Sequence, residues 1–317
     1  MSLPVEIARH LVSPFAGLFN RARLGFPRHY FHGTGGIGDD LMCSAVFCEL
    51  KKRGSGRIAM ATQYPDLFLN NPDVDKVVWH PHPRLNRWLR EGLPFVRLGY
   101  AEYDPVRDAD FPPPEHILTV ICRLAGLTGC VELRPYLFLT PEELAAGRLA
   151  ERQIVMQSSG LAAAHAMQNK EWYPPRFQEI CTRLSSGSQV IQIGSLKDPK
   201  LEGSMDLRGK TSLRQSAAIL ANSLVFVGLV GGLMHLSRAV DCRSVIIYGG
   251  REKPSQTGYI ANQNLYSPVA CAPCWLRNRC DYDRKCMDRI IVEQVLAAAA
   301  EQLARHGIPL EVQTAQL

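Results

Sequence analysis

Three short segments of the sequence combine glycines or small residues with one side chain able to move a proton or hold an anion. The first is GTGGIGDD, residues 33–40, which follows a short apolar run and precedes a helical pattern. Glycines allow a tight turn and a close approach to a ligand, and a carboxylate there can take a proton from an attacking hydroxyl. Asp39 is therefore a candidate general base. The alternative is that Asp39 or Asp40 only caps the following helix.

The second segment contains a candidate phosphate-binding lysine. SSG, residues 158–160, follows a predicted strand, and NKEW, residues 169–172, precedes a predicted helix. A lysine in this place can neutralise a diphosphate. A solvated surface lysine is the alternative for Lys170.

The third segment is VGLVGGLMHL, residues 227–236, in which a predicted strand runs into a glycine pair and then into a helix. The bare N–H groups at the start of such a helix can hold a phosphate. His235 falls in the first turn, near that anion. A histidine in an apolar helix is more often a core residue, but the glycines before it favour a role in ligand binding.

A cluster of cysteines near the end of the chain has the spacing of a metal site. Four of the ten cysteines lie close together, at Cys271, Cys274, Cys280 and Cys286. The first pair has the C-x2-C spacing of a zinc knuckle. Four thiolates can hold a structural zinc or iron ion and leave no open coordination position. Disulfides or reduced thiols are the alternative. The other six are predicted to be small core residues.

Strands and helices alternate around these segments, as in a parallel doubly wound sheet. In the first half we predict strands over 29–32, 57–62 and 74–79, helices over 41–53, 66–71 and 115–126, and a loop-heavy, Pro- and Arg-rich insertion over 81–114. In the second half we predict strands over 154–156, 190–193, 224–227 and 245–248, and helices over 175–184, 212–222, 232–240 and 289–305. Two such units imply domains over 1–145 and 146–317, with a cleft at the carboxyl ends of the strands.

The bulk composition limits the class of protein. The 317 residues suit two domains, and the net charge of +6 fits an anionic ligand, an anionic membrane surface or ordinary surface charge. No apolar run is long enough to span a bilayer and no secretory signal is recognisable, so we expect a cytoplasmic protein. Residues 5–23 predict an amphipathic helix, interrupted at Pro14, that packs on the protein or lies on the inner face of the membrane.

Taken in this order, the segments resemble glycosyltransferase family 9, the ADP-heptose:lipopolysaccharide heptosyltransferases. The resemblance covers about residues 28–300 and is carried by GGIGDDLMCSAVFCELKKR, LFLNNPDVDKVV, NKEWYPPRFQEI, DLRGKTSLRQSAAILANSLVFVG, GGLMHLSRAV, IIYGG and CAPCWLRNRCDYDRKCM. It implies an α/β GT-B fold, in which two Rossmann-like domains face each other across a cleft. It also implies an inverting enzyme without a catalytic cofactor, which moves a sugar from a nucleotide-sugar donor, typically ADP-heptose.

The resemblance also assigns roles to individual residues. Asp39 takes the place of the catalytic aspartate. The donor site maps to Ser158, Ser159, Lys170, Thr211, Ser212, Gly231, Gly232, Leu233, Met234 and His235. One departure concerns the position before the glycine pair, which is usually acidic and helps hold the donor sugar. Here it is Val230, which cannot accept hydrogen bonds from sugar hydroxyls.

The prediction is therefore a sugar transferase acting on a lipopolysaccharide or another anionic glycolipid or glycan. Arg84, Arg87, Arg90 and Arg97 are expected to face that acceptor. The alternatives are a transferase for another sugar or a protein acceptor, and a GT-B protein that binds a glycan or nucleotide without catalysis. A nucleic-acid partner is not predicted, because the basic residues near the cysteines alternate with acids and form no basic stripe.

Overall fold

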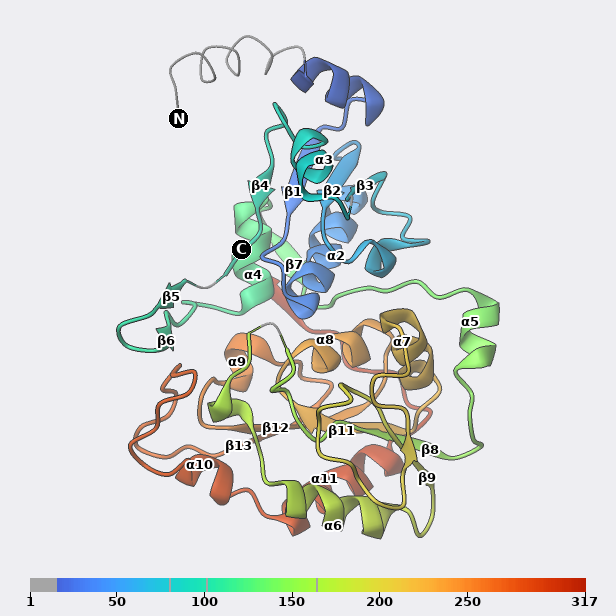
Figure 1. The fold of residues 1–317 in the computed structure, drawn as a ribbon, viewed down its shortest axis with the longest axis vertical. Coiled ribbons are helices and arrows are strands. Elements are labelled where there is room, and N and C mark those ends of the chain that lie inside the picture. The colour runs from blue at the N-terminus through green and yellow to red at the C-terminus, as the bar shows by residue number, and fades with distance from the viewer. Residues whose placement is uncertain (1–15, 80, 101, 164) are drawn as a thin grey trace.

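The computed structural model describes residues 16–317 except 80, 101 and 164, and it contains one parallel sheet in each half of the chain (Figure 1). The first sheet has the order β3-β2-β1-β4. Its strands are β1 (His29–His32), β2 (Ile58–Ala61), β3 (Lys76–Val78) and β4 (Val96–Arg97). All of β2 is buried, as expected for a parallel strand that is covered on both faces.

Helical segments connect these strands. They are α2 (Ile37–Lys52), the short 3-10 helix η1 (Pro65–Phe68) and α3 (Pro83–Trp88). Helix α2 has two lysines in its last turn, where a positive charge interacts favourably with the helix dipole. It begins at Ile37, within the glycine-rich segment and four residues before the predicted start, so the predicted order of strand, glycine turn and helix is confirmed but the start of the helix is not.

The second sheet is larger, with the order β10-β9-β8-β11-β12-β13 and only parallel pairings. Its strands are β8 (Gln153–Met156), β9 (Gln189–Gln192), β10 (Met205–Asp206), β11 (Val225–Leu229), β12 (Ser244–Gly249) and β13 (Gln263–Tyr266). In chain order this is 3-2-1-4-5-6, the Rossmann arrangement, whose strand order reverses between the first and fourth strands. Ligands bind at that reversal, beyond the carboxyl ends of the strands, which here means beside β8 and β11.

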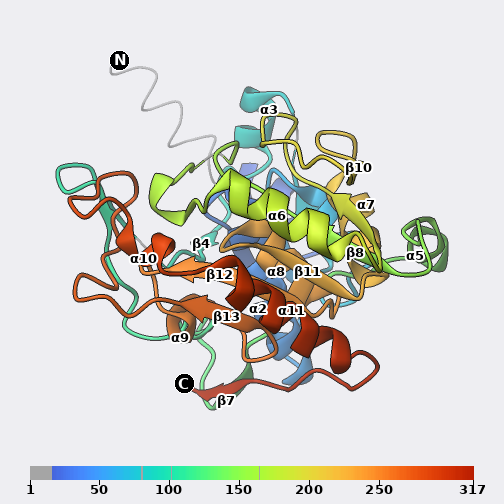
Figure 2. The same cartoon turned by 90° about the horizontal axis from the view of Figure 1, so that it is seen from below.

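Helices cover both faces of the second sheet. Helices α6 (Pro174–Leu184) and α11 (Val292–Ala304) lie on the outer face, which is turned toward the viewer in Figure 2. Helices α7 (Leu213–Ala221) and α8 (Gly232–Ala239) lie on the other face, and α8 packs against α2 of the first half. The start of α8 is thereby held opposite the start of α2.

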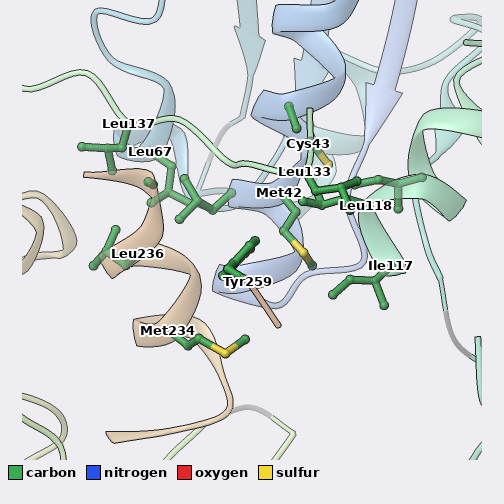
Figure 3. Packing of buried hydrophobic residues seen from close by; sticks show 14 of the residues in the cluster. Met42, Cys43, Leu67, Ile117, Leu118, Leu133, Leu137, Met234, Leu236 and Tyr259 are labelled. Carbon is green, nitrogen blue, oxygen red and sulfur yellow. The ribbon is translucent and has the colours of Figure 1, made fainter. Parts of the chain in front are cut away.

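One hydrophobic cluster crosses from the first half of the chain into the second. Met42 and Ile117 contribute from the first half, and Met234, Leu236 and Tyr259 contribute from the second (Figure 3). All five side chains are buried. The two halves therefore share an apolar contact, which fixes the relative positions of the polar loops at its edge.

The remaining elements are short. They are β5 (Tyr103–Asp104), β6 (Ala109–Asp110), α4 (Ile117–Leu124), β7 (Cys130–Glu132), α5 (Pro141–Ala146), η2 (Gln168–Lys170), α9 (Pro254–Thr257), α10 (Lys285–Asp288) and β14 (Thr314–Gln316). The last strand, β14, pairs antiparallel with β7 of the first half. The division near residue 145 remains a prediction, and the end of the chain returns across it.

The structure differs from the sequence-based expectation over residues 81–114. We expected a loop-heavy insertion, but the segment contains α3, the hairpin β5–β6, and β4, which pairs with β1. Two-residue strands carry no recognisable periodicity, so their partners alone decide that they form. Residues 16–23 are helical, as predicted. Pro14 and the rest of the predicted N-terminal helix lie outside the described residues.

Candidate active site

A cavity of about 860 Å³ lies between the two halves and is lined from both. The loops that follow β1, β4, β8, β9, β11 and β12 all reach it, and each starts at the carboxyl end of a parallel strand. The loops after β8 and β11 flank the point where the strand order of the second sheet reverses. The cavity therefore occupies the place where doubly wound sheets bind their ligands.

Asp39 lines this cavity from the first turn of α2. Its carboxylate accepts hydrogen bonds from Thr34 Oγ1 at 2.5 Å and from Tyr100 OH at 3.1 Å. Burial, with the nearby carboxylates Asp39 and Glu252, raises the pKa of Tyr100 well above its ordinary value. The phenol therefore stays protonated as a donor and orients Asp39 toward the cavity.

Asp40 has a different environment, although it is the next residue. It is 1% exposed and accepts hydrogen bonds from Thr62 Oγ1 and the backbone N–H of Gly35. Burial raises its pKa from 3.8 to about 6. Asp40 thus fixes the glycine-rich turn, while Asp39 faces the cavity. The N-cap residue of α2, Gly36, makes no side-chain cap.

Two helices begin at the cavity without a side-chain cap. Gly36, Ile37 and Gly38 at the start of α2, and Gly231 and Gly232 at the start of α8, all line it. Free backbone N–H groups and the positive end of the helix dipole favour an anion at such places. The cavity is therefore suited to a phosphorylated ligand at the start of α8.

His235 follows in the first turn of α8 and also lines the cavity. It is 6% exposed, and its Nδ1 shares a 2.6 Å hydrogen bond with Tyr259 OH. Burial, together with the charge of Lys170, lowers its pKa to about 3. The imidazole is therefore neutral and buried in the cavity wall.

Lys170 reaches the cavity from the end of η2 and is paired with Glu252, which follows β12. The distance from Lys170 Nζ to Glu252 Oε1 is 2.7 Å. Burial alone raises the pKa of Glu252, but the charges of Lys170 and Arg251 outweigh it and lower that pKa to about 2. The carboxylate is thus ionised across the working range of pH.

The ion pair continues into a chain of buried charges that joins the two halves. Arg251 NH1 donates to Glu252 Oε1 at 3.0 Å, and Arg251 NH2 donates to Asp110 at the end of β6. Arg277 also donates to Asp110, at 2.5 and 3.0 Å, and its guanidinium lies 3.9 Å from the centre of the Tyr103 ring. These side chains form one wall of the cavity.

Most of the residues predicted for the site are brought together, and three are not. Asp39 and, among the predicted donor residues, Ser159, Lys170, Thr211, Gly231, Gly232, Leu233 and His235 line the cavity. Ser158, Ser212 and Met234 are not part of its lining. Ser158 donates to the backbone oxygen of Pro199, Ser212 caps α7, and Met234 is fully buried in the core. Val230 is part of the lining.

The predicted acceptor-facing arginines also separate. Arg97 lines the cavity, whereas Arg84, Arg87 and Arg90 are exposed on α3 and just after it and are not part of the lining. Figure 1 shows α3 beside the N-terminal helix, at the end of the molecule remote from the second sheet. The four arginines lie close together in the sequence, so their positions along the chain did not reveal this separation. Only Arg97 lies on β4, which returns toward the cleft.

The cysteine-containing loop packs at the carboxyl end of β12. A Cβ on Gly250 would lie 2.8 Å from Cys286 Cβ and 2.9 Å from Ala272 Cβ, so the glycine admits the loop. The four cysteines are free thiols of intermediate burial. Within the part of the chain that the structure describes, no three His, Cys, Asp or Glu side chains are grouped to hold a metal ion. As arranged here, the four thiols do not fit a metal site.

This loop nevertheless contributes to the cavity through Trp275 and Arg277. It is joined to the hairpin β5–β6 by a bridge between Ala109 and Leu276 and by backbone bonds to Asp108 and Asp110. The sequence-based interpretation did not include the cavity residues Thr34, Tyr100, Asp110, Arg251, Glu252, Trp275 and Arg277. Three of them carried a local signal: Thr34 lies within the glycine-rich segment, and Arg251 and Glu252 directly follow a predicted strand and two glycines.

Comparison with known proteins agrees with this geometry. The model of glycosyltransferase family 9 (heptosyltransferase) matches residues 145–283, which include β8, Lys170, α8 and Glu252. The matched residues are similar to a glycosyltransferase family 9 domain. The match confirms the predicted resemblance and makes the chain a glycosyltransferase. No curated protein matches the chain.

Solved structures extend the likeness to both halves. ADP-heptose lipopolysaccharide heptosyltransferase II of E. coli is 17% identical, with a TM-score of 0.65 over 87% of this chain and 98% of that one. The iron-containing dodecameric glycosyltransferase TibC of enterotoxigenic E. coli is 18% identical, with a TM-score of 0.68 over 89% and 81%. TibC in complex with ADP-D-β-D-heptose is 18% identical, with a TM-score of 0.65 over 88% and 77%. At these identities the likeness confirms the predicted GT-B fold.

Proposed function

We propose that this glycosyltransferase moves a sugar from a nucleotide-diphosphate donor to a glycan hydroxyl, with inversion at the anomeric carbon. Asp39 takes the proton from the attacking hydroxyl, which forms the new bond to the anomeric carbon as the bond to the diphosphate breaks. Lys170 and the start of α8 stabilise the negative charge on the departing nucleoside diphosphate. The proposed reaction uses no catalytic cofactor.

One observation carries this proposal: a carboxylate from the first half of the chain and a lysine from the second half line the same cavity. Asp39 and Lys170 both belong to its lining, with the uncapped start of α8 beside them. A base and an anion site in one cavity are what a direct displacement of a diphosphate requires. Thr34 and Tyr100 hold the base in place.

The proposed donor is ADP-heptose, and the proposed acceptor is a lipopolysaccharide or another anionic cell-surface glycan. The family description and the solved complex of TibC with ADP-D-β-D-heptose support the donor. Arg97 and Arg277 in the cavity wall support an anionic acceptor. Val230 offers no hydrogen bond to a sugar hydroxyl, which favours a second candidate: transfer of another sugar by the same site, or to a protein acceptor.

A carboxylate-to-amide substitution at the proposed base tests this function. Asn at position 39 keeps the size of the side chain but cannot take a proton, so Asp39→Asn should lower turnover by a factor of about 10² to 10⁴. Binding of ADP, measured by calorimetry, should persist. Asp66→Asn removes an exposed carboxylate on η1 that does not line the cavity, and it should behave as the unchanged protein.

Two results would contradict the proposal. Sugar transfer by Asp39→Asn at the unchanged rate would remove Asp39 from the role of base. Binding of ADP-sugars by the unchanged protein, with no turnover on any glycan offered, would support a GT-B protein that binds nucleotide sugars without catalysis.

We further propose that the protein acts in the cytoplasm, in contact with the inner face of the membrane. None of the helices that the structure describes is long and apolar enough to cross a bilayer. Support for peripheral contact comes from the helix of residues 16–23 and from α3, whose side chains Leu18, Phe19, Leu85 and Trp88 are exposed. Exposed arginines lie among them, at Arg21, Arg23, Arg84, Arg87 and Arg90. Apolar side chains with basic neighbours suit an anionic lipid surface.

A further inference from the structure

The partner of Lys170 raises a question that the proposed function leaves open. A lysine that binds a diphosphate gains from being unpaired, yet Lys170 is already bound to the buried carboxylate of Glu252 at 2.7 Å. Glu252 is 2% exposed and lines the same cavity. A carboxylate close to the site of a diphosphate repels it, so its presence calls for a function other than attraction of the ligand.

The surroundings of Glu252 make it a rigid anchor. Arg251, which is 1% exposed, holds Glu252 Oε1 at 3.0 Å. The same guanidinium also donates to Asp110 and to the backbone oxygens of Leu276 and Trp275. These partners of Arg251 are themselves buried or part of the backbone, so the orientation of the guanidinium is fixed. The carboxylate oxygen that Lys170 contacts is fixed with it.

We propose that Glu252 is a positioning residue of the donor site, which holds the Lys170 ammonium where the leaving diphosphate develops its charge. A lysine side chain has several rotatable bonds, and ordering it costs conformational entropy. The contact with Glu252 meets that cost before the donor arrives. The Lys170 ammonium has three N–H donors, so it can keep Glu252 and still donate to a phosphate oxygen. This inference rests on the proposed function.

The anchoring of Glu252 also ties the donor lysine to the first half of the chain. Asp110 lies on β6 of the first half and holds both Arg251 and Arg277 of the second. The chain Lys170, Glu252, Arg251, Asp110 therefore spans the cavity wall from the donor side to the hairpin β5–β6. The position of the lysine depends on the two halves being in contact at this wall.

The experiment replaces the carboxylate with its neutral isostere and separates turnover from binding. Glu252→Gln removes the charge that repels the diphosphate, and it weakens the anchor of Lys170 because only a neutral amide oxygen is left to accept from the ammonium. We expect kcat to fall about tenfold or more, as for loss of an interaction made in the transition state, while the Kd for ADP is unchanged or lower. Adenosine, which carries no phosphate, should bind equally to both proteins.

A matched control and a double substitution show whether Glu252 acts through Lys170. Glu49 is also buried, at 6% exposure, and pairs with two cations, Lys52 and Arg53, but it does not line the cavity. Glu49→Gln should leave kcat unchanged. In a Lys170→Met background, Glu252→Gln should cost no more than about twofold in kcat, because coupled residues lose their effect once the partner is gone.

Each other outcome overturns the inference. An unchanged kcat in Glu252→Gln would show that Lys170 needs no anchor. A parallel loss of kcat, ADP affinity and Tm would show that Glu252 has a structural role only. A full additional loss in the Lys170→Met background would show that Glu252 does not act through Lys170. If the unchanged protein bound no nucleoside diphosphate, the proposed function itself would be rejected.

Discussion

Gly38 in α2 and His235 in α8 meet so closely that a Cβ on Gly38 would lie 2.7 Å from His235 Cδ2. The same Cβ would lie 3.3 Å from the Cα of Gly232, so it would meet backbone as well. Glycine at position 38 therefore allows the starts of the two helices to approach each other at the edge of the cavity. The glycine-rich segment that the sequence associates with ligand binding thus also permits the contact between the two halves.

Gly38→Ala should separate the two helix starts. The methyl group forces His235 or the backbone of α8 to move, which we expect to cost about 1–3 kcal/mol of folding free energy, as for overpacking in a core. Affinity for ADP should fall as well, because the start of α8 is displaced. Urea denaturation and calorimetry measure the two effects. Gly187→Ala is the control, because a Cβ on Gly187 would meet nothing within 4 Å, and this variant should be as stable as the unchanged protein. If Gly38→Ala were equally stable, the predicted clash would be refuted.

Asp40→Asn should stabilise the protein at neutral pH and not in acid. Burial raises the pKa of Asp40 from 3.8 to about 6. The folded protein therefore binds a proton that the unfolded chain has lost between about pH 4 and pH 6, and stability falls as the pH rises through this window. Asparagine is neutral throughout, so the gain should reach about 3 kcal/mol above pH 6 and vanish near pH 4. Denaturation at several pH values measures the gain in the free energy of unfolding. A gain that did not change with pH would show that the Asp40 carboxyl does not titrate in this range.

The proposed membrane surface predicts binding to anionic vesicles. The Phe19 ring contacts that of Trp88 at 5.7 Å between centroids, and Phe19 is 56% exposed. Phe19→Ser should reduce co-sedimentation with phosphatidylglycerol vesicles. Neutral phosphatidylcholine vesicles should bind less protein, since exposed arginines lie on the same two helical segments as Phe19 and Trp88. Val312 is 65% exposed in the C-terminal segment, and Val312→Ser provides the control. Equal binding to both kinds of vesicle would argue against this surface.

The cysteine loop predicts a result from elemental analysis. C-x2-C spacing is typical of a structural zinc or iron site, but the described side chains form no metal-holding group, so we expect elemental analysis of the purified protein to find no zinc or iron. About one equivalent of metal per chain, lost in Cys274→Ser together with thermal stability, would support the metal. Purified protein without zinc or iron would leave the cluster as thiols. In either case Trp275 and Arg277 should remain in the cavity wall.

The local elements of this protein could be predicted from the sequence because their signals lie within a few residues. The run from strand to glycines to helix at residues 29–52 appears in the structure, although its helix starts four residues earlier than predicted. The run at residues 225–239 appears with nearly the predicted bounds. Glycines and helix starts also indicated where an anion would bind. The same reasoning selected Ser158 and Ser212, which the structure uses for an internal hydrogen bond and for a helix cap.

The sequence by itself determined two α/β units, the glycine-rich turns, and the side chains Asp39, Lys170 and His235 that follow them. Only the tertiary structure decided what these side chains contact. Arg251 and Asp110 are 141 positions apart, and Arg277 and Asp110 are 167 apart, so no local pattern records their pairing. The different roles of Asp39 and Asp40 were also decided by the tertiary structure. Both residues lie in the first turn of one helix, but Asp39 lines the cavity while Asp40 is buried and supports the turn.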